Sequence, residues 1–471
     1  MNPPGILDSF ANPQQPDTMC GIATPLGRGG IGVIRLSGPD ALAVAAKVFH
    51  GKHCPSETVS HRILHGKFVD PETKNEIDEV LVSVFKKPNS YTGEDVAELS
   101  FHGSPAVLGL ALSILTKQGI RLARPGEFTF RAFYNGRIDL TQAEAVAELV
   151  SAKSEKSAQA AYRQLQGSLK DFIGRLRADL IEALAWLEMS ADFVEEDIAF
   201  KKVEEISDKF SSILDQVASL EDSYQRSRIV RDGLLVTIVG APNVGKSSLF
   251  NRLLTRDRSI VTAIPGTTRD AINEYVVLAG YPVCFVDTAG IHQTKDAVET
   301  IGIDRTVRHL EDSDLIFWVL DGSAGFTDED REIRRMIGER PAAAVINKLD
   351  IAAKEKISEC QQSVELADKF ATSAVTGEGI EQVVDWLVSN YLELRTDRQA
   401  YPFIINQRHL TALAAAKKHL RLAQKAISNR QSHEFAAFDA RKAADFLGEI
   451  TGQTTPDDIL NKIFADFCIG K

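Results

Sequence analysis

One segment of the sequence has the residue types and spacing of a nucleoside triphosphate site. The segment GAPNVGKSSLF, residues 240–250, matches the pattern G-x-x-x-x-G-K-[ST] and follows the apolar stretch GLLVTIVG. The backbone N–H groups of such a loop can surround phosphates, while Lys246 reaches the β- and γ-phosphates and the Ser247 hydroxyl binds magnesium. A chance match in an ordinary strand–turn–helix is the alternative. The strand and helix expected on either side favour the phosphate site.

Two later segments have the residues that recognise a guanine base. NKLD, residues 347–350, follows an apolar stretch. Its Asp350 carboxylate can accept two hydrogen bonds from a guanine edge, which adenine cannot supply. TSAVTGEG, residues 372–379, follows the next apolar stretch, and its Ser373 and Ala374 would lie behind the base. We therefore predict that the nucleotide is GTP rather than ATP.

The segments PGTTRD (265–270) and DTAG (287–290) supply the remaining expected contacts. Thr268 would give magnesium a second hydroxyl, Asp287 would hold the ion through water, and the Gly290 N–H would contact the γ-phosphate. All five motifs then stand in order at ordinary spacing, which turn-forming glycines alone do not explain. The predicted GTP-binding residues are Asn243, Val244, Gly245, Lys246, Ser247, Ser248, Thr262, Ala263, Ile264, Pro265, Gly266, Thr267, Thr268, Asp287, Thr288, Ala289, Gly290, Asn347, Lys348, Leu349, Asp350, Ser373 and Ala374.

Two positions depart from the pattern of Ras. In Ras a glutamine follows the DTAG segment and orients the attacking water. Here that position is Ile291, which cannot hold a water. The phosphate loop also contains Asn243, whose amide oxygen could ligate a monovalent cation that neutralises transition-state charge in place of an arginine finger. The alternative role of Asn243 is to form the turn of the loop.

The elements that must position these motifs are predicted from the periodicity of apolar residues. Residues 231–392 alternate short apolar strands with helical stretches, which is typical of a parallel sheet whose carboxyl ends carry the functional loops. Helical periodicity dominates residues 125–230 and 393–471. The simplest interpretation is a nucleotide domain inserted into one helical domain, and separate helical domains are the alternative. Residues 17–124 are predicted to be mixed α/β, with strands at 31–38, 63–69, 79–85 and 95–102 and helices at 41–49 and 104–117.

In the inserted domain, strands are expected in the stretches GLLVTIVG, YPVCFVD, DLIFWVLD, AAAVINK and KFATSA. These stretches are short and apolar, and each ends in a polar or glycine-rich motif.

Composition limits the classes of protein to consider. At 471 residues, two or three domains are expected. No apolar run reaches the roughly 20 residues that span a bilayer, and residues 1–16 are expected to form a disordered extension rather than a signal peptide. The five scattered cysteines favour a reducing, cytoplasmic environment. The net charge of −11 argues against a protein that coats nucleic acid with its whole surface.

Four segments outside the nucleotide motifs carry a family resemblance. They are GRGGIGVIRLSG (27–38), YTGEDVAEL (91–99), RPGEFTFRAFYNGRIDLTQAEAV (124–146) and the terminal FCIGK (467–471). With these segments the chain closely resembles the MnmE (TrmE) family of bacterial and organellar tRNA modification GTPases, one of the TrmE-Era-EngA-type GTPases. The resemblance extends from about residue 17 to the end of the chain.

The resemblance implies a multidomain fold of α/β and all-α parts. A mixed α/β domain at 17–124 would dimerise and bind tetrahydrofolate, and 125–230 and 393–471 would form a helical domain. A P-loop GTPase domain of the Ras type, at 231–392, would be inserted into that helical domain. The family also implies a homodimer, a tRNA substrate and an FAD-dependent partner, MnmG (GidA), in a heterotetramer, with no membrane association.

The resemblance also implies an answer to the missing glutamine. In this family a glutamate on the helix after DTAG positions the water, in the context V-E-x-I-G-I, and here VETIGI makes that residue Glu299. From the residues alone, Glu299 would be a solvated carboxylate near a helix N-terminus. Potassium would take the place of the arginine finger beside Mg²⁺. Its implied ligands are Asn243, Thr262, Ile264 and Thr267.

A second site is implied for 5-formyl- or 5,10-methylene-tetrahydrofolate. A carboxylate can accept from the adjacent donors of a pteridine, and a basic side chain suits the anionic glutamate tail. The family's folate contacts map to Arg35, Glu98, Arg137 and the terminal Lys471. Without the family, Arg35 and Arg137 would be read as surface residues. Cys468 in CIGK is a possible thiol of the modification site, and a buried structural cysteine is the alternative.

The resulting interpretation is a potassium-activated GTPase that, with its partner, adds an aminomethyl-type or carboxymethylaminomethyl group at C5 of the wobble uridine of certain tRNAs. The first alternative is a ribosome-assembly GTPase of the Era or Der type. That alternative predicts a basic RNA-binding module at the C-terminus or tandem G domains, and neither is found in the sequence. The second alternative is a folate-dependent one-carbon transferase regulated by GTP hydrolysis, which only identification of the substrate excludes.

Overall fold

The computed structural model describes residues 17–192, 198–255, 273–287, 310–393, 403–429, 433–454, 460 and 463–464. The chain divides into two compact units, described separately below. The first unit comprises Met1–Val150, Gln164–Val217 and Thr411–Lys471, and the second comprises Ser151–Arg163 and Ala218–Leu410. Among the described residues, no helix is both long and apolar enough to span a membrane.

A seven-stranded sheet forms the N-terminal part of the first unit, in the order β3-β4-β5-β6-β2-β1-β7. Only the β1–β7 pair is parallel. The strands are β1 (Met19–Ile22), β2 (Gly29–Ser37), β3 (Phe49–Gly51), β4 (Arg62–Val69), β5 (Glu76–Phe85), β6 (Val96–Gly103) and β7 (Arg121–Leu122). Helices α1 (Ala41–Val48) and α2 (Pro105–Lys117) share a buried core with this sheet, which includes Leu36, Leu99 and Leu108. The four strands and two helices predicted between residues 31 and 117 are confirmed.

A network of buried charges anchors helix α3 (Glu127–Tyr134) to this sheet domain. The Glu127 carboxylate is fully buried and accepts hydrogen bonds from the Arg121 and Arg131 guanidinium groups and from the Arg124 N–H. Arg131 also donates to the Asp17 carboxylate at 2.6 Å. Burial alone would raise the pKa of Glu127, but its hydrogen bond to Arg121 and the other contacts outweigh burial and hold that pKa below its usual value.

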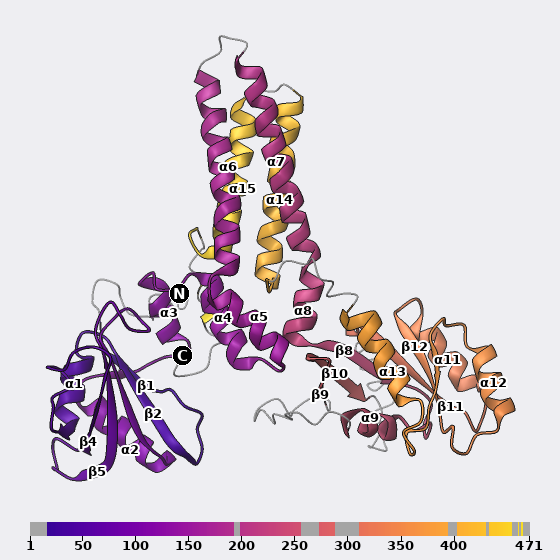
Figure 1. Ribbon diagram of the computed structural model, residues 1–471, viewed down its shortest axis with the longest axis horizontal. Coiled ribbons are helices and arrows are strands. Elements are labelled where there is room, and N and C mark those ends of the chain that lie inside the picture. Colours follow the sequence, from indigo (N-terminus) through magenta and orange to yellow (C-terminus); the bar gives the residue numbers. More distant parts are fainter. Residues whose placement is uncertain are drawn as a thin grey trace, which may run out of the picture. The chain divides into compact units, whose positions relative to one another are not determined.

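Four long helices run alongside one another in the rest of the first unit (Figure 1). They are α6 (Ser168–Asp192), α7 (Ile198–Asp222), α14 (Gln407–Ser428) and α15 (His433–Thr451). Ion pairs join α6 to α15 and α6 to α7, and a Gln424–Ser211 hydrogen bond joins α14 to α7. Helix α4 (Leu140–Ser151) precedes them in the sequence. Helices α5 (Glu155–Leu165) and α8 (Tyr224–Asp232) lie wholly or almost wholly in the second unit. The predicted helical character of residues 125–230 is confirmed for the described part of this range, where the helices are α3 to α8.

The second unit contains a six-stranded sheet in the order β13-β12-β11-β8-β10-β9. All five strands predicted in this region are present and parallel to one another, and β9 is an additional, antiparallel edge strand. The strands are β8 (Leu234–Val239), β9 (Asn273–Leu278), β10 (Tyr281–Asp287), β11 (Leu315–Asp321), β12 (Ala342–Asn347) and β13 (Lys369–Ala371). The helices are α9 (Lys246–Thr255), α11 (Asp328–Ile337), α12 (Lys354–Ser363), α13 (Ile380–Leu387) and the π-helix η3 (Val388–Glu393).

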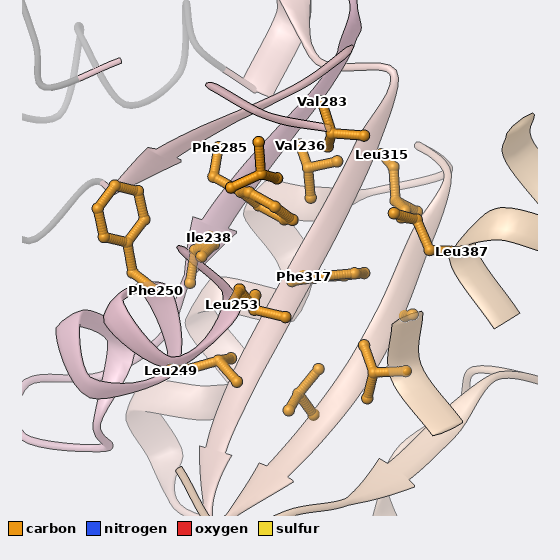
Figure 2. Close-up of a cluster of buried hydrophobic side chains, with 14 of the residues drawn as sticks. Val236, Ile238, Leu249, Phe250, Leu253, Val283, Phe285, Leu315, Phe317 and Leu387 are labelled. Atoms are coloured by element: carbon orange, nitrogen blue, oxygen red, sulfur yellow. The ribbon is translucent and has the colours of Figure 1, made fainter. Parts of the chain in front are cut away.

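The apolar core of this sheet holds helix α9 and the loop that precedes it. Leu249 and Leu253 of α9 are fully or almost fully buried, in one cluster with Ile238 of β8 and Phe317 of β11 (Figure 2). Each such side chain contributes about 1.5–3 kcal/mol on burial. The start of α9 is therefore fixed directly after the carboxyl end of the central strand β8.

The buried network around Glu127 predicts that the first unit loses stability in acid. The folded-state pKa of Glu127 lies below its ordinary value of 4.5, so its contribution is present above that value and lost as the pH falls through the folded pKa. A Glu127→Gln protein should lose about 3 kcal/mol of unfolding free energy at pH 7, because Arg121 and Arg131 lose their buried counter-charge.

The measurement is urea unfolding followed by circular dichroism between pH 3 and 7. The control is Glu72→Gln, which changes an exposed carboxylate 3.7 Å from Lys117. Equal stability of the Glu127→Gln and wild-type proteins at pH 7 would show that the network does not stabilise the fold.

Candidate functional site: a guanine nucleotide site and a second, arginine-lined hollow

The phosphate loop connects β8 to α9 and has a strained backbone. Asn243 and Gly245 have φ angles of +63° and +96°, in the left-handed region that favours glycine. A Cβ atom on Gly245 would lie 2.3 Å from the Asn347 amide nitrogen, so a larger residue cannot stand there. The Lys246 ammonium is buried and donates to the carbonyls of Gly240 and Ala241 at 2.9 and 2.8 Å. The loop thus places a cation and the N-terminus of α9 together, which suits an anionic ligand.

The Asn347 side chain joins this loop to the two predicted base-recognition segments. Its amide nitrogen donates to the Val244 carbonyl at 3.0 Å, and its amide oxygen accepts from the Ala374 N–H at 2.9 Å. Asn347 is the last residue of β12 and is 2% exposed. A buried amide with both ends satisfied fixes its partners firmly, because breaking either bond leaves a buried polar group unpaired.

The predicted base-recognition residues come together at the same edge of the sheet. The Ser373 hydroxyl donates to the exposed Asp350 carboxylate at 2.6 Å and accepts from the Thr376 N–H at 3.1 Å. The Leu349 N–H donates to the Thr372 carbonyl at 3.0 Å. The carboxylate that would accept from guanine is therefore oriented before any base arrives.

One residue of this site was missed in the sequence. Asp321 ends β11, and its carboxylate accepts from the Lys348 ammonium at 2.6 Å and from the Ser323 hydroxyl. Burial alone would raise the pKa of Asp321, but the hydrogen bond from Lys348 and the other contacts hold it below its usual value. The pair fixes the Lys348 side chain, whose own backbone has a φ of +67°. The sequence contained a signal for this residue, because Asp321 stands at the end of an apolar strand, as the other motifs do.

Several predicted residues lie outside the described part of the chain. For Asp287, the structure places the backbone at the end of β10, paired with Ile238 of β8, without describing the side chain. The others are Thr262, Ala263, Ile264, Pro265, Gly266, Thr267, Thr268, Thr288, Ala289, Gly290, Glu299, Cys468 and Lys471. Their roles stay predictions.

The described residues of the proposed metal sites have suitable donors. Ser247 lies in the first turn of α9 and Asn243 in the phosphate loop, and both side chains are exposed. Hydroxyl and amide oxygens suit magnesium and potassium as hard cations. Within the described ranges, no group of three His, Cys, Asp or Glu side chains is arranged to hold a metal ion.

The first unit contains the other predicted site, where Arg35 and Glu98 are directly paired. They are cross-strand neighbours on β2 and β6, and the Arg35 Nε donates to the Glu98 carboxylate at 2.8 Å. The Arg35 guanidinium lies 5.1 Å from the centre of the Tyr91 ring and 5.4 Å from that of Phe128. Two aromatic faces and a carboxylate thus hold one guanidinium. Tyr91 was not predicted as a site residue, although it opens the YTGEDVAEL segment.

Arg137 lies in the same region as Tyr91. Both residues line a hollow of about 400 Å³, together with His61, Phe85, Asn89 and Ser90. A Cβ atom on Gly93, whose φ is +78°, would lie 3.2 Å from the Arg137 Cγ, so the glycine lets this side chain pass closely. The structure therefore places Arg35 between Glu98 and the Tyr91 ring, and Arg137 beside Tyr91 in the hollow. Two guanidinium groups and a carboxylate fit a ligand with an anionic tail and amino-pteridine donors.

Two protein families match the chain over almost its whole length. The family described as "GTP-binding protein TrmE N-terminus" matches residues 18–137, and the family described as "MnmE helical domain" matches residues 140–468.

Curated relatives match at full length. A tRNA modification GTPase MnmE of Carboxydothermus hydrogenoformans is 42% identical over 459 residues, covering 97% of this chain and 99% of the relative. A protein of the same name from Acetivibrio thermocellus is 39% identical over 455 residues, again covering 97% and 99%. Among solved structures, the G domain of the Thermotoga maritima FeoB iron transporter is 26% identical and covers 33% of this chain and 97% of its own, with a TM-score of 0.26.

Proposed function

Because the chain belongs to the MnmE family of tRNA modification GTPases, and is therefore a GTP-hydrolysing enzyme, we propose that it modifies C5 of the wobble uridine of certain tRNAs. The observation that supports this most is that both domain families match in one chain, with relatives aligned over 97% of it. The group added would be of the aminomethyl or carboxymethylaminomethyl type. GTP hydrolysis would drive the conformational cycle.

The nucleotide part of the proposal rests on the geometry around Asn347. The phosphate loop and the Asp350–Ser373 pair are joined by the Asn347 amide, so phosphates and base would bind to a site with fixed spacing. Lys246 and the N-terminus of α9 would meet the phosphates. Magnesium, held by the Ser247 and Thr268 hydroxyls, would supply positive charge at the β- and γ-phosphates.

Glu299 would position the attacking water, and potassium would supply the positive charge that an arginine finger supplies in other GTPases. Ile291 stands where Ras has glutamine, and the Asn243 amide is exposed in the phosphate loop. With Asn243, the further potassium ligands would be Thr262, Ile264 and Thr267. Two copies of the chain would pair, as the family resemblance implies.

Hydrolysis should therefore depend on both potassium and Glu299. Replacing potassium with sodium, or Glu299 with alanine, should lower kcat by about a hundredfold or more, because each removes a group acting mainly in the transition state. GTP affinity, measured by fluorescence of a labelled nucleotide, should change little. A fully active Glu299→Ala protein, or equal turnover in the two salts, would contradict this assignment.

The modification chemistry is proposed to use the hollow beside Tyr91. Tetrahydrofolate, held by Arg35, Glu98, Arg137 and Lys471, would supply a one-carbon unit. An FAD-dependent partner, MnmG (GidA), would act with a homodimer of this chain in the cytoplasm. The G domain would be inserted in the helical domain, and the two parts of the first unit that flank Ala218–Leu410 in the sequence support that arrangement. No observation favours an Era- or Der-type role in ribosome assembly.

The function is tested by mass spectrometry of tRNA nucleosides from cells with and without this protein. Cells lacking it should lose the 5-aminomethyl-type uridines and accumulate the plain or only thiolated uridine. The wild-type gene should restore the modification. An Arg35→Met gene should not, because its guanidinium is proposed to bind folate, whereas Arg62→Met, at an exposed position of β4, should do so.

An unchanged nucleoside profile in cells lacking the protein would contradict the proposed function. Full restoration by the Arg35→Met gene would contradict the folate assignment alone.

A further inference from the structure

A short segment before the helical bundle belongs to the unit that contains the nucleotide site. Residues Ser151–Arg163 form one compact unit with the six-stranded sheet. The Lys153 ammonium lies 3.8 Å from the centre of the Tyr275 ring, and the Lys156 ammonium lies 3.7 Å from that of Tyr281. Both tyrosines belong to the β9–β10 hairpin. Two cations of one segment therefore contact two aromatic rings of one hairpin.

Local hydrogen bonds fix the position of both lysines. The Ser154 hydroxyl accepts from the Ser157 N–H at 3.2 Å, and the Ser154 N–H donates to the Ser157 hydroxyl at 2.9 Å. This reciprocal pair is the capping arrangement that fixes where a helix begins, here at Glu155 of α5. Lys153 precedes the first residue of α5, and Lys156 lies in the first turn of that helix.

The hairpin side of the contact is equally constrained. Tyr275 faces Cys284 across the two strands. Burial and the neighbouring Cys284 thiol raise the pKa of Tyr275 to about 12, so the ring stays neutral. At the turn, Gly280 has a φ of +83°, and a Cβ there would lie 3.2 Å from the Lys156 side chain. The alkyl chain of Lys156 therefore packs against the backbone of the turn.

The ends of this hairpin lead into the catalytic motifs. β9 begins at Asn273, shortly after Thr268 of the PGTT motif, and β10 ends at Asp287 of DTAG. Asn273 pairs with Val286, so these two ends lie at the same end of the hairpin. Tyr281, at the turn, is about 20 Å from Asp287 at the usual rise of a strand. Lys156 therefore contacts the hairpin at the end opposite Asp287, whereas Lys153 contacts Tyr275, whose cross-strand partner Cys284 stands three residues before Asp287.

We propose that Lys153 and Lys156 are positioning residues for GTP hydrolysis, which hold the β9–β10 hairpin in place. In the sequence, β9 follows shortly after Thr268 and β10 ends at Asp287, the two proposed magnesium contacts. The inference rests on the proposed magnesium roles of Thr268 and Asp287. It does not depend on the tRNA substrate. Strand β8 pairs with one strand of the hairpin, β10. The other strand, β9, is the edge strand of the sheet, and the two lysines supply a second support for the hairpin.

A role limited to covering the edge strand makes a different prediction. An edge cover protects unpaired backbone groups, so its loss would lower stability and nucleotide affinity together. Positioning residues instead change the step in which the γ-phosphate is transferred, while the phosphate loop and the Asp350–Ser373 pair go on binding the nucleotide. The ratio of kcat to binding affinity separates the two roles.

The test uses the full chain with the double substitution Lys153→Met and Lys156→Met, which keeps side-chain length and removes both charges. We expect kcat to fall about fivefold or more. The affinity for GDP, measured with a fluorescent analogue, and the Tm should stay close to those of the wild type. Lys153→Arg with Lys156→Arg should retain kcat, because arginine keeps the cation over the ring. The matched control is Lys354→Met with Lys356→Met, which removes two exposed charges from the same unit.

Three results would overturn the proposal. They are an unchanged kcat in the methionine variant, a parallel loss of kcat, GDP affinity and Tm, and an arginine variant as slow as the methionine variant. If the double variant does not fold, the single Lys156→Met protein is measured against the same three criteria. Because the assay contains no tRNA, failure of the wobble-uridine function would leave these results unaffected.

Discussion

The side-chain amide of Asn347 links the three loops that make up the described nucleotide site. It donates to the Val244 carbonyl in the phosphate loop and accepts from the Ala374 N–H behind the predicted base position. A buried amide loses more by breaking such bonds than an exposed one, because water cannot replace them. The distance between the part of the site that binds phosphate and the part that reads guanine is thereby fixed before the nucleotide binds. Gly245 is required for the same reason, since no Cβ fits beside this amide.

The parallel sheet explains why these loops can meet at all. β8, β11 and β12 are neighbours. The phosphate loop follows the carboxyl end of β8, and Asp321 and Asn347 are the last residues of β11 and β12. Lys348 is then fixed by Asp321, and Asp350 by Ser373, so each recognition residue has a partner that orients it. The second predicted site, in the first unit, follows the same principle. There Glu98 and the Tyr91 ring orient Arg35.

Motifs with a strong local signal were predictable from the sequence. The phosphate loop, NKLD and the strands before them follow from glycine spacing and short apolar runs, and the structure confirms those elements. Contacts that join distant segments were not predictable in this way. Asn347 was predicted as a nucleotide contact, but its bond to Val244, 103 residues away, depends on which strands are neighbours. Strand β9 was missed because the other five strands are parallel and buried, whereas β9 is a single antiparallel edge strand. The charged network around Glu127 was also missed, since a buried carboxylate looks like a surface residue until its arginine partners are known.

One buried amide holds the phosphate-binding and base-binding loops together, and nucleotide affinity in an Asn347→Ala protein measures this directly. GTP and inosine triphosphate, which lacks the 2-amino group that Asp350 would read, should be compared by calorimetry, with Asn390→Ala as an exposed control. Both nucleotides should bind about tenfold or more weakly, by a similar factor, because both halves of the site lose their common support. GTP affinity within twofold of the wild type, or a loss for GTP without a loss for inosine triphosphate, would contradict it.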